Sequence, residues 1–313
     1  MPVFTYGGKM KNLKIKGFEF ESCKEKIPYS LIHDSKPIRL SEEMTMALEL
    51  LLWYVPNINS MQSSKNELVS SMDFDDFVFG ICKEKMNLNN SDVCFLDDIS
   101  PDVVNFYLKV LCPRDEKLIL TRALNESKTD SLLRHIRNSI AHGCFNVVSD
   151  LFIGFDFKSS ANKLSECSAI IKIKPQNLLK ALLALEDEVT SERLAQIALQ
   201  RTGYYVEKFG KYDSSHSFDF FVKKDDKNFA LEVKKYNDFE TLPQDEVDKL
   251  VRQFENISKD LIPILFINTS LLTDKSKERL LQEKIIILDI KNIKKMLKKR
   301  DMIGEIVKDS DAL

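Results

Sequence analysis

The sequence predicts an α+β protein of two domains, a mostly α-helical bundle with small β additions followed by an α/β domain with a mixed central sheet. Three observations predict this organisation. Apolar residues follow helical spacing over most of residues 41–143. Alternating patterns and short apolar runs, typical of strands, dominate after residue 204. The acidic triplet at 186–188 separates the two patterns, so we expect domains at 1–188 and 189–313, each long enough for its own core.

The composition is that of a globular protein, with 43% hydrophobic and 30% charged residues. A formal net charge of −2 excludes a global basic field, so any nucleic-acid surface must be local. The six cysteines form no CxxC pair, which predicts reduced core thiols in a cytoplasmic protein and argues against a zinc site. We see no secretory signal, lipidation motif or apolar run of about 18 residues, so we expect neither export nor membrane insertion.

The first domain begins with a strand-like segment. Leu13 and Ile15 alternate with lysines and Gly17 permits a bulge, so a small N-terminal sheet is expected. Ser41 then caps a helix that ends before Pro56. Further helices are predicted at residues 74–86, 101–111 and 114–123.

Residues 130–143 form the most informative helix of this domain. Its apolar stripe consists of Leu132, Leu133, Ile136 and Ile140. Gly143 is placed to end the helix, and Arg137 and His142 lie outside the stripe. His142 is at the helix C-terminus, where the macrodipole favours the imidazolium, and Asn138 is one turn before it. His142 is therefore a candidate for proton transfer, whereas His33 and His135 are assigned structural roles.

The run from Arg137 through Asn138 to His142 resembles the R-x4–6-H signature of the HEPN family. Active members of that family are metal-independent ribonucleases that work as dimers. The resemblance implies that His142 handles protons around a ribose 2′-hydroxyl, that Arg137 holds the scissile phosphate and that Asn138 supports them. Arg137 and His142 are about 140° apart around one helix, so two facing copies would present them better than one copy does. The alternative is a helix-end histidine and a surface arginine in a domain used only for dimerisation or binding.

The first domain closes with a hairpin and a helix. Strands are predicted at 152–157 and 169–173, joined by a polar segment with Ser159, Ser160 and Asn162. Pro175 opens the helix that leads to the boundary.

The second domain opens with a helix at 191–202 and a strand at 204–209. A hairpin with a polar turn then spans 218–236. On its second strand Glu232 and Lys234 project from one face, and Asp219 comes from the neighbouring strand. Two carboxylates beside an ammonium group suit a divalent metal that activates water and neutralises phosphate charge.

The arrangement of Asp219 with Glu232, Val233 and Lys234 resembles the D…ExK signature of the PD-(D/E)XK, restriction-endonuclease-like superfamily. The resemblance implies that Asp219 and Glu232 hold Mg²⁺ (or Mn²⁺) and that Lys234 assists the attacking water. Supporting roles are implied for Glu192 on the preceding helix and, by similarity to Mrr-like nucleases, for Gln253 on the following one. The alternatives are a solvated strand face and, for Glu192, a macrodipole partner.

The rest of the second domain continues the α/β pattern. An amphipathic helix at 247–257 precedes near-continuous apolar strands at 261–268 and 285–290, with a helix between them. The final segment is a helix whose basic face is expected to contact nucleic-acid phosphates, unless it is simply solvated surface. The lysines of that face are Lys294, Lys295, Lys298 and Lys299.

Three functions follow from these motifs. The favoured one is a metal-dependent DNA endonuclease of the prokaryotic restriction or anti-phage type. Its HEPN-like part would form a homodimer and could also cleave RNA. The first alternative is a metal-independent HEPN ribonuclease or toxin whose C-terminal domain only binds nucleic acid. The second alternative is a non-catalytic nucleic-acid-binding or regulatory protein. The defence setting rests on family analogy.

Overall fold

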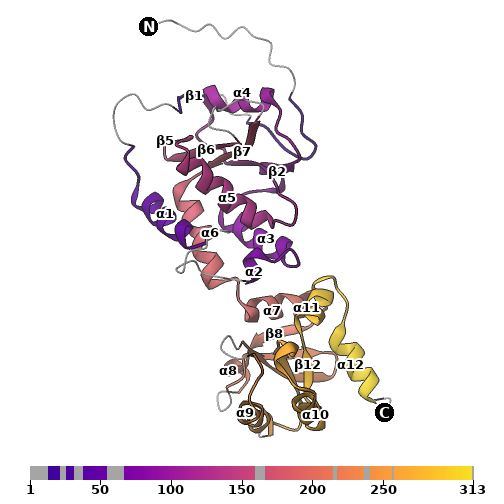
Figure 1. Cartoon of the computed structure of the whole chain (residues 1–313). Helices are drawn as coiled ribbons and strands as arrows, with labels where there is room; N and C mark the ends of the chain where they lie inside the picture. The colour runs from indigo at the N-terminus through magenta and orange to yellow at the C-terminus, as the bar shows by residue number, and fades with distance from the viewer. Residues whose placement is uncertain are drawn as a thin grey trace, which may run out of the picture. The chain divides into compact units, whose positions relative to one another are not determined.

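The computed structural model describes residues 13–21, 26–31, 38–54, 67–158, 166–213, 217–235, 240–255 and 257–311. The chain divides into two compact units, Met1–Val189 and Thr190–Leu313 (Figure 1). Several residues of the sequence predictions lie outside the described residues, namely Cys23, His33, Pro56, Ser159, Ser160, Asn162 and Tyr236.

The first unit contains one five-stranded mixed sheet in the order β2-β4-β7-β6-β5. Its strands are β2 (Val93–Leu96), β4 (Lys117–Thr121), β5 (Phe145–Val148), β6 (Leu151–Phe157) and β7 (Cys167–Ile173). Strand β2 is parallel to β4, and the other neighbours are antiparallel. The turn between β5 and β6 has Ser149 and Asp150 at φ 49° and 60°, the left-handed region that a two-residue hairpin of type I′ needs. Strands at 152–157 and 169–173 were predicted, and both are confirmed.

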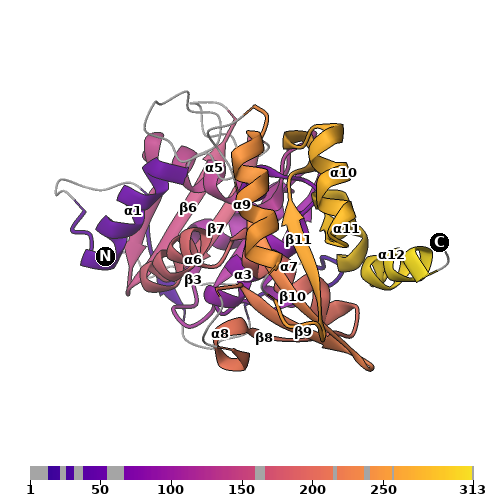
Figure 2. The same cartoon turned by 90° about the horizontal axis from the view of Figure 1, so that it is seen from below.

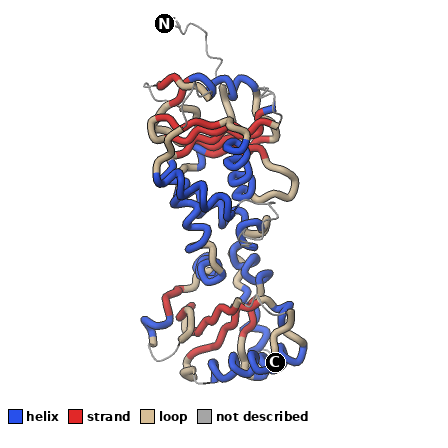
Figure 3. Tube along the Cα trace, turned by 60° about the vertical axis from the view of Figure 1, so that its left-hand side comes forward, coloured by secondary structure: helices blue, strands red, loops and turns tan. Residues whose placement is uncertain are grey.

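Helices cover both faces of this sheet. They are α1 (Glu42–Tyr54), α2 (Glu67–Ser70), α3 (Asp75–Lys85), α4 (Pro101–Lys109), α5 (Lys128–Ala141) and α6 (Pro175–Asp187), with a 3₁₀ turn at Asn90–Asp92. Tyr107 of α4 packs in one core with Ile153 and Phe155 of β6. Gly154, between them, faces the opposite side, where a Cβ would lie only 2.6 Å from the Oγ of Ser139 on α5. Figures 1 and 3 show the sheet between α4 and the other helices.

Some sequence predictions for this unit were wrong. Residues 117–121 form the strand β4, not part of a helix at 114–123, because pairing with β2 and β7 buries this apolar run on both faces. Gly17, at φ 77°, lies in a tight turn closed by an Ile15–Phe18 bridge rather than in a strand bulge. The short strand β1 (Ile27–Pro28) pairs with β3 (Val110–Leu111). Cys112 is disulfide-bonded, so the expectation that all six cysteines are reduced is also wrong. The buried cysteines Cys82, Cys94, Cys144 and Cys167 are free.

The second unit is a five-stranded mixed sheet in the order β12-β11-β10-β9-β8. Its strands are β8 (Tyr205–Lys208), β9 (Phe220–Lys224), β10 (Lys227–Lys234), β11 (Leu261–Ile267) and β12 (Ile286–Leu288). Strands β10, β11 and β12 are parallel, whereas β8, β9 and β10 are antiparallel neighbours. This mixed central sheet is the one that the sequence predicts.

The helices of the second unit lie on the two faces of its sheet. They are α7 (Ser191–Arg201), α8 (Phe209–Tyr212), α9 (Gln244–Glu255), α10 (Asp274–Gln282), α11 (Ile290–Leu297) and α12 (Met302–Asp311), with a 3₁₀ turn at Thr269–Leu271. Figures 1 and 2 show α9 and α10 on one face and α7 and α11 on the other. The amphipathic stripe predicted for α9 is confirmed, because Val247, Leu250 and Phe254 are buried in the core.

Within the described ranges, every helix is too short or too polar to cross a bilayer.

Candidate active site

The hairpin of β9 and β10 brings the two candidate carboxylates to one edge of the sheet. Asp219 immediately precedes β9, and its backbone N–H donates to the carbonyl of Leu231 at 3.1 Å. One oxygen of its side chain, Oδ2, accepts a hydrogen bond of 2.8 Å from the backbone N–H of Val233. The Asp219 carboxylate is therefore held against the residue that lies between Glu232 and Lys234 in the sequence.

Glu232 is a buried acid with one oxygen left without a hydrogen bond. Its side chain is only 7% exposed, and its Oε1 is 2.5 Å from the Nζ of Lys234. Its Oε2 is buried and has no hydrogen-bond partner among the described residues. Burial raises the pKa of Glu232 above its ordinary value, the nearby Lys234 and Gln253 oppose this rise, and the negative charge of Asp219 adds to it.

Gln253 reaches the site from α9, on the face of the sheet that carries Glu232. Ala230, two residues before Glu232 and on the same face, packs in the same core as Phe254 of α9. The Nε2 of Gln253 donates to the carbonyl of Ser217, at 3.0 Å, in the segment that leads to Asp219. The structure thus brings Gln253 together with the acid pair.

Glu192 lies in the first turn of α7 and is half-buried. In the part of the chain that the structure describes, it makes no hydrogen bond or ion pair with Asp219, Glu232 or Lys234. The structure therefore does not bring Glu192 into contact with the acid pair.

The residues of this edge fit a divalent cation. A buried carboxylate oxygen without a hydrogen-bond donor is a ready ligand for a hard cation, and a second carboxylate lies beside it. The described residues contain no group of three or more His, Cys, Asp or Glu side chains suited to a metal. A cation here would therefore take two protein carboxylates and complete its shell with water and substrate oxygens, which is the arrangement typical of Mg²⁺.

The basic segment after residue 290 is a helix, α11, docked on the second unit. Asp289 caps it, and Ile293 and Met296 are buried beneath it. The side chains of Lys295, Lys298 and Lys299 are exposed, whereas that of Lys294 is half-buried. The expected docked helix with a basic outer face is present.

The other motif is at the end of α5 in the first unit. His142 is the exposed C-cap of this helix, and its backbone N–H donates to the carbonyl of Asn138 at 2.9 Å. Gly143, at φ 66°, then ends the helix as predicted. Arg137 is half-buried, and its Nε is buried without an acceptor among the described residues.

A buried acid connects α5 to the sheet. Asp156 of β6 accepts hydrogen bonds from the Nδ2 of Asn138 at 3.0 Å and from the Nδ1 of His135 at 2.7 Å. The other nitrogen of His135 is 2.8 Å from the carbonyl of Thr121, and its ring is fully buried. Burial alone would raise the pKa of Asp156, but the contacts with His135, Asn138 and Arg134 hold it below its ordinary value. His135 and Asn138 therefore fix α5 on the sheet.

Asn138 and His142 line a cavity of about 380 Å³ between the end of α5 and the sheet. Arg137 is not among the residues that line it. The cations beside His142 are Arg122, Arg134 and Lys158. None of these three residues was predicted from the sequence. Only Arg134 could have been found from the sequence, because it precedes Asn138 by four residues and His142 by eight and so lies on the same helix face.

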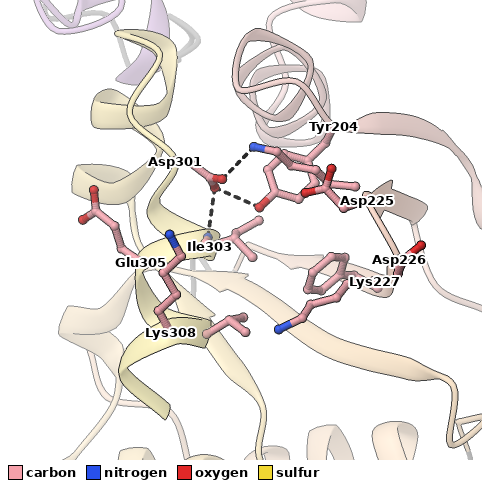
Figure 4. A pocket seen from close by; sticks show the side chains of 12 residues that line it. Tyr204, Asp225, Asp226, Lys227, Asp301, Ile303, Glu305 and Lys308 are labelled. Carbon is pink, nitrogen blue, oxygen red and sulfur yellow. Dashed lines mark hydrogen bonds and ion pairs between the residues drawn. The ribbon is translucent and has the colours of Figure 1, made fainter. Parts of the chain in front are cut away.

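A second cavity, of about 620 Å³, lies in the second unit at the hairpin turn, the end of β9 and β10 away from the acid pair (Figure 4). Asp301 organises it. Its carboxylate accepts hydrogen bonds from the hydroxyl of Tyr204, from the Nζ of Lys224 and from the backbone N–H of Gly304 at 2.7–2.9 Å.

Comparison with protein-family models gives two matches. A model described as HEPN pEK499 p136 matches residues 21–193, and a restriction endonuclease model, that of the Mrr catalytic domain, matches residues 186–297. No curated protein and no solved structure matches the chain significantly.

Proposed function

Since the chain belongs to the HEPN pEK499 p136 family and carries a restriction endonuclease domain of the Mrr type, we propose that it is a metal-dependent DNA endonuclease with its active site at Asp219, Glu232 and Lys234. The restriction endonuclease domain makes nuclease chemistry the general activity. Metal dependence, DNA as the substrate and a cytoplasmic role in prokaryotic restriction or anti-phage defence are the specific parts of the proposal.

One observation carries the proposal. The Asp219 carboxylate is bonded to the backbone of Val233, next to a buried Glu232 whose Oε2 has no hydrogen bond among the described residues. A protein that needed this acid for stability alone would satisfy both of its oxygens, because an unsatisfied buried charge costs free energy. An acid that binds a cation must instead keep an oxygen available.

Each side chain of the site then has a separate role in the reaction. Bound Mg²⁺ or Mn²⁺ supplies an activated water and neutralises the charge that develops on the phosphate. Asp219 and Glu232 hold the cation, and Lys234 orients the attacking water or steadies the developing negative charge. Gln253 holds the backbone of Ser217 and with it the segment from which Asp219 projects.

The lysines on α11 and just after its end, three of them exposed and Lys294 half-buried, suit contact with the substrate backbone. Phosphate contacts of this kind give affinity without sequence preference. We assign them to Lys294, Lys295, Lys298 and Lys299.

The test is a cleavage panel of single- and double-stranded DNA and RNA, each with Mg²⁺, Mn²⁺ or EDTA. The proposal expects DNA cleavage with Mg²⁺ or Mn²⁺ by the wild type and by the matched controls Lys235→Ala and Asp260→Asn, whose side chains are exposed. It expects no cleavage by Asp219→Asn or Lys234→Ala. Cleavage by these two variants at the wild-type rate would refute the assignment. Tight binding without turnover under every condition would favour the non-catalytic alternative.

A second candidate function is metal-independent ribonuclease activity at the end of α5, supported by the exposed His142 beside a cavity that several cations line. His142 would take the proton of a ribose 2′-hydroxyl while the 2′-oxygen attacks the phosphorus. The P–O5′ bond then breaks, and the departing oxygen takes a proton from solvent. Because Arg137 does not line the cavity of its own copy, its family role would require a homodimer in which a second copy presents it. RNA cleavage that resists EDTA and is lost in His142→Ala would support this candidate.

A further inference from the structure

The cavity beside His142 is built entirely from one copy of the chain. Arg134, Asn138 and His142 are spaced by four residues on α5, so they fall within about 80° of one another around the helix. Thr121 at the end of β4 and Asp156 near the end of β6 also line the cavity. The site therefore needs no second copy to bring cations to His142.

The cations of this cavity differ in how firmly they are held. Arg134 binds both oxygens of Glu126, at 2.5 and 2.8 Å, and so acts as part of the framework. Arg122 makes a single contact of 3.1 Å with Asp75, and its side chain is 36% exposed. Lys158 is 61% exposed and lies 4.0 Å from Asp98, which is itself 90% exposed. The Lys158–Asp98 pair is exposed on both sides and contributes little, so an incoming anion can replace it. The Arg122–Asp75 pair is different, because Asp75 is buried, but it engages only the Nη1 of Arg122.

The acid inside the cavity does not oppose an anion strongly. Asp156 is 3% exposed, and its Oδ2 is surrounded by the donors of His135 and Asn138, with Arg134 at 3.8 Å. Its charge is thus compensated from within the protein. Asp97 is the other acid that lines the cavity, against four cationic or protonatable side chains.

We propose that this cavity is a backbone-phosphate subsite for single-stranded RNA, in which Arg122 and Lys158 bind the phosphate next to His142 within one copy of the chain. The inference rests on the ribonuclease candidate above and assigns the phosphate to residues other than Arg137. The cavity of about 380 Å³ accommodates roughly one nucleotide and not a duplex, which favours a single strand. His142 also lines it, and metal-independent cleavage by a histidine base needs the 2′-hydroxyl of RNA as the nucleophile.

The test measures binding apart from cleavage. A fluorescently labelled 2′-O-methyl RNA, which lacks the nucleophilic hydroxyl, is titrated in EDTA and followed by anisotropy. We expect Arg122→Gln and Lys158→Gln each to weaken binding about tenfold, and to lower the slope of log affinity against log salt by about one. Arg137→Gln should bind like the wild type, as should the surface control Lys180→Gln. Circular dichroism and thermal melting verify the fold, and Arg122→Lys should restore part of the affinity.

Because the second unit can also bind nucleic acid, a local readout is required. The chain has four histidines, so the imidazole Hε1–Cε1 NMR signal of His142 can be assigned by loss in His142→Gln. RNA should shift this signal in the wild type and in Arg137→Gln, but not in Arg122→Gln combined with Lys158→Gln. An unchanged His142 signal in the wild type, or a shift that only Arg137→Gln abolishes, would overturn the proposal. Binding without cleavage of ordinary RNA would instead refute the ribonuclease candidate and leave the subsite intact.

Discussion

The two regions that carry the motifs differ in whether the backbone geometry points the motif side chains in the same direction. In the hairpin, Glu232 and Lys234 are two residues apart on a strand and therefore share a face, and antiparallel pairing adds Asp219. In α5, Arg137 and His142 are five residues apart on a helix and point in different directions, so only His142 reaches the cavity. A motif on a strand predicts its own site, whereas a motif on a helix depends on what packs around it.

The two regions also treat a buried acid differently. Asp156 receives hydrogen bonds from His135 and Asn138, which lower its pKa. Glu232 keeps an oxygen without a hydrogen bond, and burial raises its pKa. The arrangement around Asp156 stabilises the fold and does not use Arg122 or Lys158, so these two cations can bind an anion. The arrangement around Glu232 is suited to a cation that arrives from solvent.

The largest expected effect tests the strand motif. Asp219→Asn or Lys234→Ala should lower metal-dependent DNA cleavage by about 10³-fold, because each removes a group that acts on the developing charge or its cation. Single-turnover rates in Mg²⁺ measure this loss, with Lys235→Ala as the control. Equal rates for Lys234→Ala and Lys235→Ala would show that proximity on the strand does not make a site.

The next effect separates the two regions. His142→Ala should lower EDTA-resistant RNA cleavage by about 10²-fold, the usual contribution of a general base, and leave Mg²⁺-dependent DNA cleavage unchanged. Asp219→Asn should show the reverse pattern. Parallel assays on the same preparations measure both activities. Loss of both activities in either variant would mean that the two regions form one functional site.

A stability measurement tests how closely α5 packs on its sheet. Gly154→Ala places a Cβ 2.6 Å from the Oγ of buried Ser139, so we expect a loss of about 1–3 kcal/mol in the free energy of unfolding. Gly80→Ala on α3 is the matched control, because no atom lies within 4 Å of its added Cβ and alanine favours a helix. Urea denaturation measures both. A loss as large in Gly80→Ala would assign the effect to glycine replacement in general.

The smallest effect concerns the charge of Glu232. Burial raises the pKa of the Glu232 carboxyl in the folded state, so its charged form destabilises the fold at pH values above that raised pKa. The loss of stability disappears as the pH falls from the raised pKa of the folded state to the ordinary pKa of the unfolded state. Glu232→Gln should therefore raise the melting temperature by roughly 3 °C at neutral pH and lose this advantage in acid. Differential scanning calorimetry from pH 4 to 8 measures it. A variant less stable than the wild type at neutral pH would mean that the ion pair with Lys234 outweighs burial.

Mg²⁺ should act on the same group in the opposite sense. The cation should stabilise the wild type and not Glu232→Gln, and its effect should weaken as the pH falls through the raised pKa of Glu232, because protons compete for the carboxylate.

The sequence by itself determined the features that depend on neighbours along the chain. The shared face of Glu232 and Lys234 and the buried stripe of α9 follow from the periods of the strand and the helix. The end of α5 just before Gly143 follows from the left-handed φ that glycine adopts without strain. The two-part organisation follows from the change of period along the chain, and both family matches agree with it.

The tertiary structure alone decided the features that join distant segments. The apolar run at 117–121 suits a strand or a helix equally, and its pairing with β2 and β7 settled the choice. The open Oε2 of Glu232 depends on what α9 places over the sheet. Arg122 and Lys158 line one cavity with His142 because they follow the ends of β4 and β6, which pack beside α5. No local period encodes such contacts, since they arise from how whole elements pack against one another.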